Sequence, residues 1–102
     1  MKITLSELIG YIRDEIPRLR LYDTFIVLCL IDDELVGRRG FSLTGLEWYL
    51  EDGQLYWKDE EKYIDRENME VTREAQEVID STIEAVKNID DKKLRDWMKQ
   101  VL

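Results

Sequence analysis

The first residues of the chain repeat apolar side chains at the three- and four-residue spacing of a helix that buries one face. Thr4 and Glu7 match the capping box that begins many helices, so a helix is expected to start there. Pro17 disfavours helical geometry in the residue before it, so this helix is expected to end near Glu15. Its predicted apolar stripe consists of Leu5, Leu8, Ile9, Ile12 and Ile16.

The last third of the chain shows helical spacing twice. Thr72 is expected to cap a long helix, and Asp90 or Asp91 is expected to cap a second helix that runs to Leu102. Both helices carry a clear apolar stripe on one side, as amphipathic helices of a globular protein do. The opposite side of the long helix is acidic and consists of Glu77, Asp80 and Glu84.

The middle of the chain has the pattern of a buried sheet. Residues 24–31 are apolar on both faces and rich in β-branched and aromatic side chains, which is typical of a central strand covered on both sides. Residues 32–34 are then expected to form a turn, and residues 35–36 to begin a second strand. A second turn or loop is predicted at residues 37–40, because two glycines frame two arginines there.

A hairpin is predicted around Asp52-Gly53, since this dipeptide favours the positive φ angles of a two-residue turn. The flanking residues 47–51 and 54–58 then pair in register, and every pair matches in kind. Trp48, Leu50, Leu55 and Trp57 fall on one face, which is expected to turn toward the core. A short helix over about 45–52 is the alternative, because Thr44 and Glu47 also match a capping box.

Together these elements predict a single α+β domain over residues 1–102. The predicted order is an N-terminal helix, an antiparallel sheet of three or four strands, and two C-terminal helices packed on one face of that sheet. The composition agrees with a folded protein, because 44% of the residues are hydrophobic and aromatic residues are frequent.

The charge is strongly acidic and unevenly distributed. The chain carries a formal net charge of −8, and residues 47–84 hold 13 acidic and 4 basic side chains. Such a surface attracts basic proteins and disfavours nucleic acid and anionic membranes as partners. No apolar stretch reaches the length of a membrane span or the core of a signal peptide, and Cys29 is a lone cysteine, so a cytoplasmic location is expected.

The residue types needed for most catalytic and metal sites are missing. Without histidine, the chain cannot form Ser–His–Asp or Cys–His machinery, and one cysteine cannot form a zinc site. Cys29 lies in an apolar run, as expected of a buried thiol. The acidic triplets 32–34 and 59–61 offer oxygen ligands but lack the spacing of a calcium loop. We therefore expect no enzyme activity, cofactor or metal.

The segment Gly37-Arg38-Arg39-Gly40, followed by apolar Leu43 and Leu46, is similar to the GxxG loop of RNA-binding KH domains. That resemblance implies a loop between two helices that clamps a sugar-phosphate backbone. Two other interpretations stay open, which are a turn with two exposed arginines and a site for a small anion held by Arg38 and Arg39.

The function predicted from these features is a small, acidic, non-catalytic protein that binds and blocks a basic protein partner. It is similar in type to toxin-immunity proteins and to phage proteins that disarm host defences. A homo-oligomeric structural or assembly role is the alternative. The residues expected to contact the partner are Glu47, Tyr49, Glu51, Tyr56, Glu60, Glu61, Glu77, Asp80 and Glu84.

Overall fold

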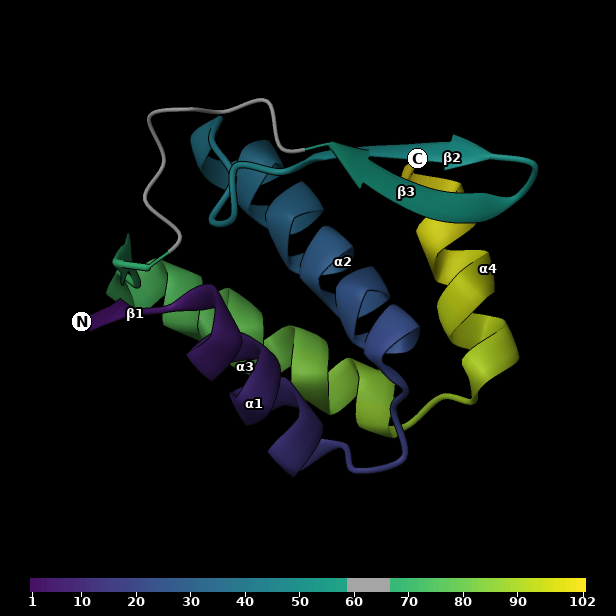
Figure 1. Ribbon diagram of the computed structural model, residues 1–102, viewed down its shortest axis with the longest axis horizontal. Helices are drawn as coiled ribbons and strands as arrows, with labels where there is room; N and C mark the ends of the chain where they lie inside the picture. The colour runs from purple at the N-terminus through teal and green to yellow at the C-terminus, as the bar shows by residue number, and fades with distance from the viewer. Residues whose placement is uncertain (59–66) are drawn as a thin grey trace.

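The computed structural model describes residues 1–58 and 67–102 of the chain. These residues form four helices and two antiparallel sheets of two strands each, an α+β arrangement (Figure 1). Among the described residues, the predicted sheet of three or four strands is not formed. In chain order the elements are β1 (Lys2–Ile3), α1 (Leu5–Glu15), α2 (Leu21–Arg39), β2 (Glu47–Glu51), β3 (Gln54–Lys58), β4 (Met69–Glu70), α3 (Arg73–Lys87) and α4 (Asp91–Val101).

Three helices begin where their sequence signals predict, and α1 ends at Glu15 as expected. The hydroxyl of Thr4 accepts a hydrogen bond from the Glu7 N–H, and the Glu7 carboxylate accepts one from the Thr4 N–H, each at 3.0 Å. Thr72 caps α3 and Asp90 caps α4 through the same kind of side-chain acceptor. The predicted helices α1, α3 and α4 are confirmed. They could be predicted because local hydrogen bonds between neighbouring residues determine where each helix begins.

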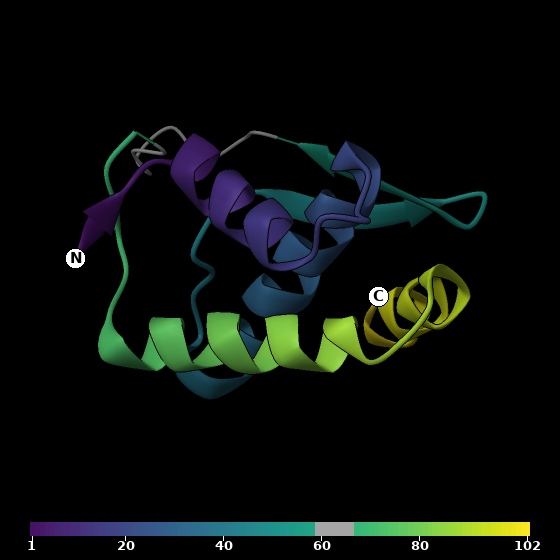
Figure 2. The same cartoon turned by 90° about the horizontal axis from the view of Figure 1, so that it is seen from below.

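The strand predicted over residues 24–31 is wrong, because these residues form the middle of the helix α2. The turn expected at residues 32–34, the strand at 35–36 and the loop at 37–40 are wrong for the same reason. Residues 37–39 complete α2, and Gly40 ends it in the left-handed region at φ 78°. α2 packs against α1, α3 and α4, and the hairpin covers a further side (Figures 1 and 2). The middle of α2 is covered on all sides, since residues 26–32 are all buried, and a segment that is apolar all round has no helical periodicity to detect.

The predicted hairpin is confirmed with its register. β2 and β3 pair antiparallel in five matched pairs, from Glu47 with Lys58 at the open end to Glu51 with Gln54 at the turn. Asp52 and Gly53 adopt φ angles of 52° and 76°, as a two-residue turn of this type requires. The alternative helix over residues 45–52 is therefore wrong.

The inner face of the hairpin packs on α2 through aromatic side chains. Leu55 is buried, and Trp48 is half-buried, in agreement with the predicted core face. Trp57 stacks on Phe25 of α2 with ring centroids 4.2 Å apart and planes inclined by 3°, but 37% of it stays exposed. The Tyr22 hydroxyl accepts a hydrogen bond of 2.7 Å from the Leu55 N–H, which also ties the hairpin to α2.

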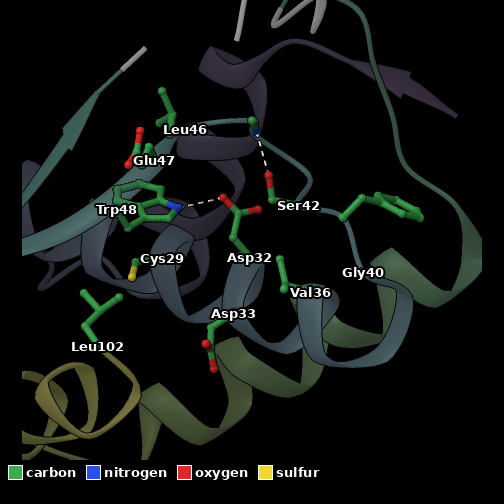
Figure 3. Close-up of a pocket in the computed structure, with 12 residues that line it drawn as sticks. Cys29, Asp32, Asp33, Val36, Gly40, Ser42, Leu46, Glu47, Trp48 and Leu102 are labelled. Carbon is green, nitrogen blue, oxygen red and sulfur yellow. Dashed lines mark hydrogen bonds between the residues drawn. The ribbon is translucent and has the colours of Figure 1, made fainter. Parts of the chain in front are cut away.

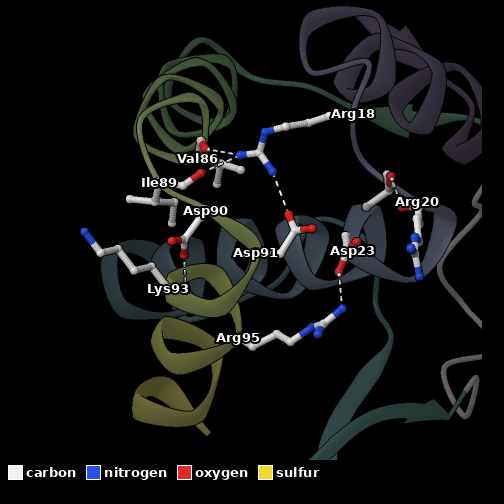
Figure 4. Close-up of polar contacts among 10 residues, drawn as sticks. Arg18, Arg20, Asp23, Val86, Ile89, Asp90, Asp91, Lys93 and Arg95 are labelled. Carbon is white, nitrogen blue, oxygen red and sulfur yellow. Dashed lines mark hydrogen bonds and ion pairs between the residues drawn. The ribbon is translucent and has the colours of Figure 1, made fainter.

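Arg18 joins the connection between α1 and α2 to the turn between α3 and α4 (Figure 4). Its guanidinium donates to the carbonyl oxygens of Val86 and Ile89, at 2.9 and 2.6 Å, and to the Asp91 carboxylate at 2.6 Å. The last carbonyl groups of a helix have no partner within that helix. Arg18 therefore satisfies the end of α3 and complements its dipole.

Candidate functional site

A pocket of about 620 Å³ lies between the second half of α2 and residues 40–48 (Figure 3). Its apolar lining includes Val36, Leu46 and Trp48, and Phe41 stands at it with 60% of its surface exposed. A cavity of this size with mostly apolar walls and a few polar groups has the character of a ligand-binding site.

Asp32 organises the pocket. It is 1% exposed, and its Oδ1 accepts hydrogen bonds from the N–H groups of Leu43 and Thr44 at 2.8 and 3.2 Å. Its Oδ2 accepts from the Trp48 Nε1–H at 2.9 Å and from the Thr44 hydroxyl. A carboxylate offers about four acceptor positions, so this side chain is satisfied. The buried carboxylate fixes residues 43–48, and with them the start of β2, against α2.

Burial determines the protonation behaviour of the pocket lining. Burial raises the pKa of Asp32, while the hydrogen bonds from Thr44 and Trp48 act in the opposite direction. Burial and the neighbouring carboxylates of Asp32 and Asp33 raise the pKa of the Cys29 thiol to about 12. Cys29 is buried, as expected, and stays a neutral thiol near pH 7, which is unsuited to nucleophilic catalysis.

The outer face of the hairpin carries four of the predicted partner-binding residues. The rings of Tyr49 and Tyr56 stack with centroids 5.7 Å apart, and the Lys58 ammonium lies 5.4 Å from the Tyr49 centroid. Glu47 and Glu51 flank the tyrosines, and both acids are exposed. We call Glu47, Tyr49, Glu51 and Tyr56 the hairpin patch. Glu47 also lines the pocket, so the patch and the pocket adjoin at this residue.

The predicted acidic residues of α3 lie on a different surface. α2 lies between α3 and the hairpin in both views of the molecule (Figures 1 and 2). The Asp80 carboxylate accepts hydrogen bonds from the Tyr11 hydroxyl at 2.8 Å and from Gln76 at 3.0 Å. Glu77 pairs with Arg73 at 3.8 Å, and Glu84 is exposed.

The structure therefore divides the predicted partner-binding residues between two surfaces. Those on the hairpin come together, and those on α3 lie apart from them. Glu60 and Glu61 lie outside the described residues.

Arg38 and Arg39 do not form the loop that the similarity to KH domains implies. Both lie in the last turn of α2, and the next element is the strand β2 instead of a second helix. The Arg38 guanidinium pairs with Glu34 at 2.9 Å, and that of Arg39 pairs with Glu74 of α3. An anion at either guanidinium would have to displace a carboxylate that already occupies it.

The pocket itself was not predicted from the sequence, because Asp32 was assigned to an exposed turn. One signal pointed to it. A carboxylate that follows directly on the apolar run 24–31 must find hydrogen-bond donors if the run is buried. The donors come from residues 43–48, and only the folded chain brings them to Asp32.

Comparison of the chain with protein-family models, with curated proteins and with solved structures finds no match. Across residues 1–58 and 67–102, no three potential metal-ligating side chains are grouped to hold an ion. Over the same residues, no helix is both long and apolar enough to cross a membrane. The pocket and the hairpin patch are thus the features that carry functional interpretation.

Proposed function

We propose that the protein is a non-catalytic binding protein that captures and blocks a basic protein partner through the hairpin patch. The observation that carries this proposal is the stacked pair Tyr49 and Tyr56, with Tyr56 42% exposed, between two glutamates. Tyrosine offers a large contact area at a low entropic cost, so exposed tyrosines are common anchors of protein interfaces. Within the described chain, Glu47 and Glu51 form no ion pair that a partner would have to break.

The overall charge supports the same partner chemistry. A net charge of −8 on 102 residues creates a negative potential around the molecule, which accelerates encounter with a basic surface and repels acidic ones. The proposed functional class is that of toxin-immunity and phage anti-defence inhibitors, which this small acidic protein resembles in type.

The experiment compares two charge reversals of equal size on opposite sides of α2. One variant carries Glu47→Lys with Glu51→Lys, and the matched control carries Glu77→Lys with Glu84→Lys. Tagged protein is used to capture a partner from a bacterial lysate at low and high salt, and the affinity of the purified partner is then measured by calorimetry. We expect a basic protein that is released at high salt.

The two variants should separate a local contact from the effect of net charge. The hairpin variant should bind the partner at least about tenfold more weakly, and the α3 variant should lose no more than about threefold. Equal losses would mean that net charge, and not the hairpin patch, governs binding. A partner whose affinity is insensitive to salt would contradict the electrostatic mechanism.

A homo-oligomeric structural role is the second candidate, and one observation favours it. Val36, Phe41 and Leu102 are exposed large apolar side chains that all line the pocket. A second copy of the chain would cover this apolar surface. Sedimentation analysis at high concentration tests the idea, because a protein that stays monomeric there cannot be an assembly subunit.

A further inference from the structure

The pocket next to the hairpin patch combines apolar walls with unpaired negative charge. Its ionisable lining residues are Asp32, Asp33, Glu47 and the neutral thiol of Cys29. Among the described residues that line it, there is no lysine or arginine. The pocket therefore favours a positively charged occupant.

The three carboxylates differ in what they can still bind. The oxygens of Asp32 are occupied by four donors from residues 43–48, so this side chain shapes the pocket and adds charge. Asp33 and Glu47 are exposed, and neither forms an ion pair within the described residues. These two side chains are free to accept hydrogen bonds from a cationic group.

We infer that this pocket receives an arginine side chain of the basic partner. The inference rests on the proposed function, and it assigns the pocket as the place where the partner's anchoring side chain is bound. An alkyl stem would lie against Val36 and Leu46, and the guanidinium group would bind the carboxylate of Asp33 or of Glu47, which lie on different sides of the pocket (Figure 3). Arginine suits this site better than lysine, because its planar group can donate two parallel hydrogen bonds to one carboxylate and can stack on an aromatic ring such as that of Trp48.

Other occupants fit the pocket less well. An anion would meet three carboxylates and no basic group. A neutral apolar group would remove water from Asp33 and Glu47 without replacing their hydrogen bonds, which is unfavourable. A second copy of the chain would bring another net charge of −8 to an acidic surface.

The first arm of the test uses the protein alone with two model compounds. N-acetylarginine methylamide carries the guanidinium, and the matching citrulline compound has the same shape without the charge. Binding is followed by two-dimensional NMR of the amide groups and of the Trp48 indole N–H. We expect the arginine compound to shift the signals of Trp48 and of residues 33 and 40–47, at an affinity at least about fivefold above that of the citrulline compound.

The second arm uses Asp33→Asn, with Asp14→Asn as its control. Both residues are exposed aspartates on helices, and Asp33 lies outside the hairpin patch. Asp33→Asn should weaken binding of the arginine compound and of the partner by at least about threefold, while Asp14→Asn should change neither. Equal binding of the arginine and citrulline compounds would overturn the inference.

The outcomes separate this inference from the proposed function. Binding of the arginine compound at the pocket, with no basic protein captured, would support the pocket chemistry and contradict the proposed function. A captured partner that depends on the hairpin patch but not on Asp33, together with no shift by the arginine compound, would overturn the pocket inference alone. If a free aliphatic diamine bound far more tightly than the arginine compound, the arginine of a partner would be the wrong source of the cation.

Discussion

The two acidic surfaces of the protein, the hairpin patch and the outer side of α3, use their carboxylates differently. On α3, Asp80 accepts two hydrogen bonds and Glu77 is paired with Arg73 one turn away, while Glu84 forms no ion pair within the described residues. On the hairpin patch, Glu47 and Glu51 have no ion-pair partner within the described chain. A paired carboxylate must give up one partner to gain another, so net charge alone does not identify a binding surface. What distinguishes the hairpin patch is that both of its carboxylates are unpaired within the described part of the chain and flank the stacked tyrosines.

The two surfaces are also attached to α2 by different forces. α3 packs on α2 through an apolar stripe that includes Val78, Ile79 and Val86, all fully buried. The hairpin and the segment before it also bury apolar side chains, Leu55 and Leu43 among them, but they add a buried hydrogen-bonded carboxylate, Asp32, that α3 lacks. The stabilisation from hydrophobic contact is spread over many atoms, whereas a buried hydrogen-bond network is weakened when any one of its donors or acceptors is removed. Removal of the Asp32 carboxylate should therefore have a larger effect than removal of an exposed carboxylate on α3.

The largest expected effect is that of Asp32→Ala. This change leaves four donors of residues 43–48 without their acceptor, two of them backbone N–H groups, so the free energy of unfolding should fall by about 3 kcal/mol. Asp80→Ala on α3 removes an exposed carboxylate with two hydrogen bonds and should lower the free energy of unfolding by less than about 1 kcal/mol. Urea denaturation measures both, and equal losses would contradict the anchoring role of Asp32.

The second prediction concerns two neighbouring aromatic residues of β3 with similar exposure. Trp57 contacts the rings of Phe25 and Trp48, while Tyr56 contacts only its cross-strand neighbour among the described rings. Trp57→Ala should therefore lower the free energy of unfolding by about 2 kcal/mol, and Tyr56→Ala by no more than about 1 kcal/mol. Thermal denaturation of both variants checks this order, and the reverse order would show that the hairpin packs through its outer face.

The third prediction separates binding from stability. Tyr56→Ser should weaken binding of the basic partner by about tenfold, because it removes an exposed interface anchor. Tyr11 of α1 is a matched control, since it is 41% exposed against 42% for Tyr56 and lies on the α3 side of the molecule. Tyr11→Ser should leave the affinity within about twofold of the wild type. A calorimetric titration compares the two, and a loss confined to Tyr11→Ser would move the interface to the α3 side.

The smallest expected effect is the dependence of stability on pH. Burial raises the pKa of Asp32 in the folded protein above its ordinary value of 3.8, so the unfolded chain releases this proton first as the pH rises. The contribution of Asp32 to the free energy of unfolding is therefore fully present below its ordinary pKa of 3.8 and is lost as the pH rises through its pKa in the folded protein. The slope cannot exceed about 1.4 kcal/mol per pH unit for one group.

The measurement is the difference in unfolding free energy between wild type and Asp32→Asn over a range from about pH 4 to about pH 7. The stability of the wild type relative to the variant should decline with rising pH, because only the wild type loses this contribution. A relative stability that rises with pH would mean that the hydrogen bonds to the ionised carboxylate outweigh its burial.

The hairpin and three of the helices could be predicted from the sequence because local chemistry specifies them. An Asp-Gly turn determines the register of the residues on either side, and a capping side chain marks the residue where a helix begins. The central helix could not be predicted in this way. Every residue of 24–31 except Phe25 is buried, and the covering elements are distant in sequence, so the apolar run matches a strand and a helix equally well.

The candidate site shows the same limit. The pairing of Tyr49 with Tyr56 was predicted, since it depends only on the turn. The pocket was not predicted, because Asp32 and Trp48 come together only when α2 is a helix and residues 40–46 fold back along it.

The sequence by itself determined the hairpin and the helices α1, α3 and α4, whose turn or caps involve residues only a few positions apart. It also determined the acidic charge. Local signals are sufficient there because the interacting groups are neighbours in the chain. Only the tertiary structure decided that α2 is the central helix, that the acidic residues divide between two surfaces, and that Asp33 and Glu47 line the same pocket. These outcomes depend on which residues, distant in the sequence, bury each side chain, and a local sequence pattern does not contain that information.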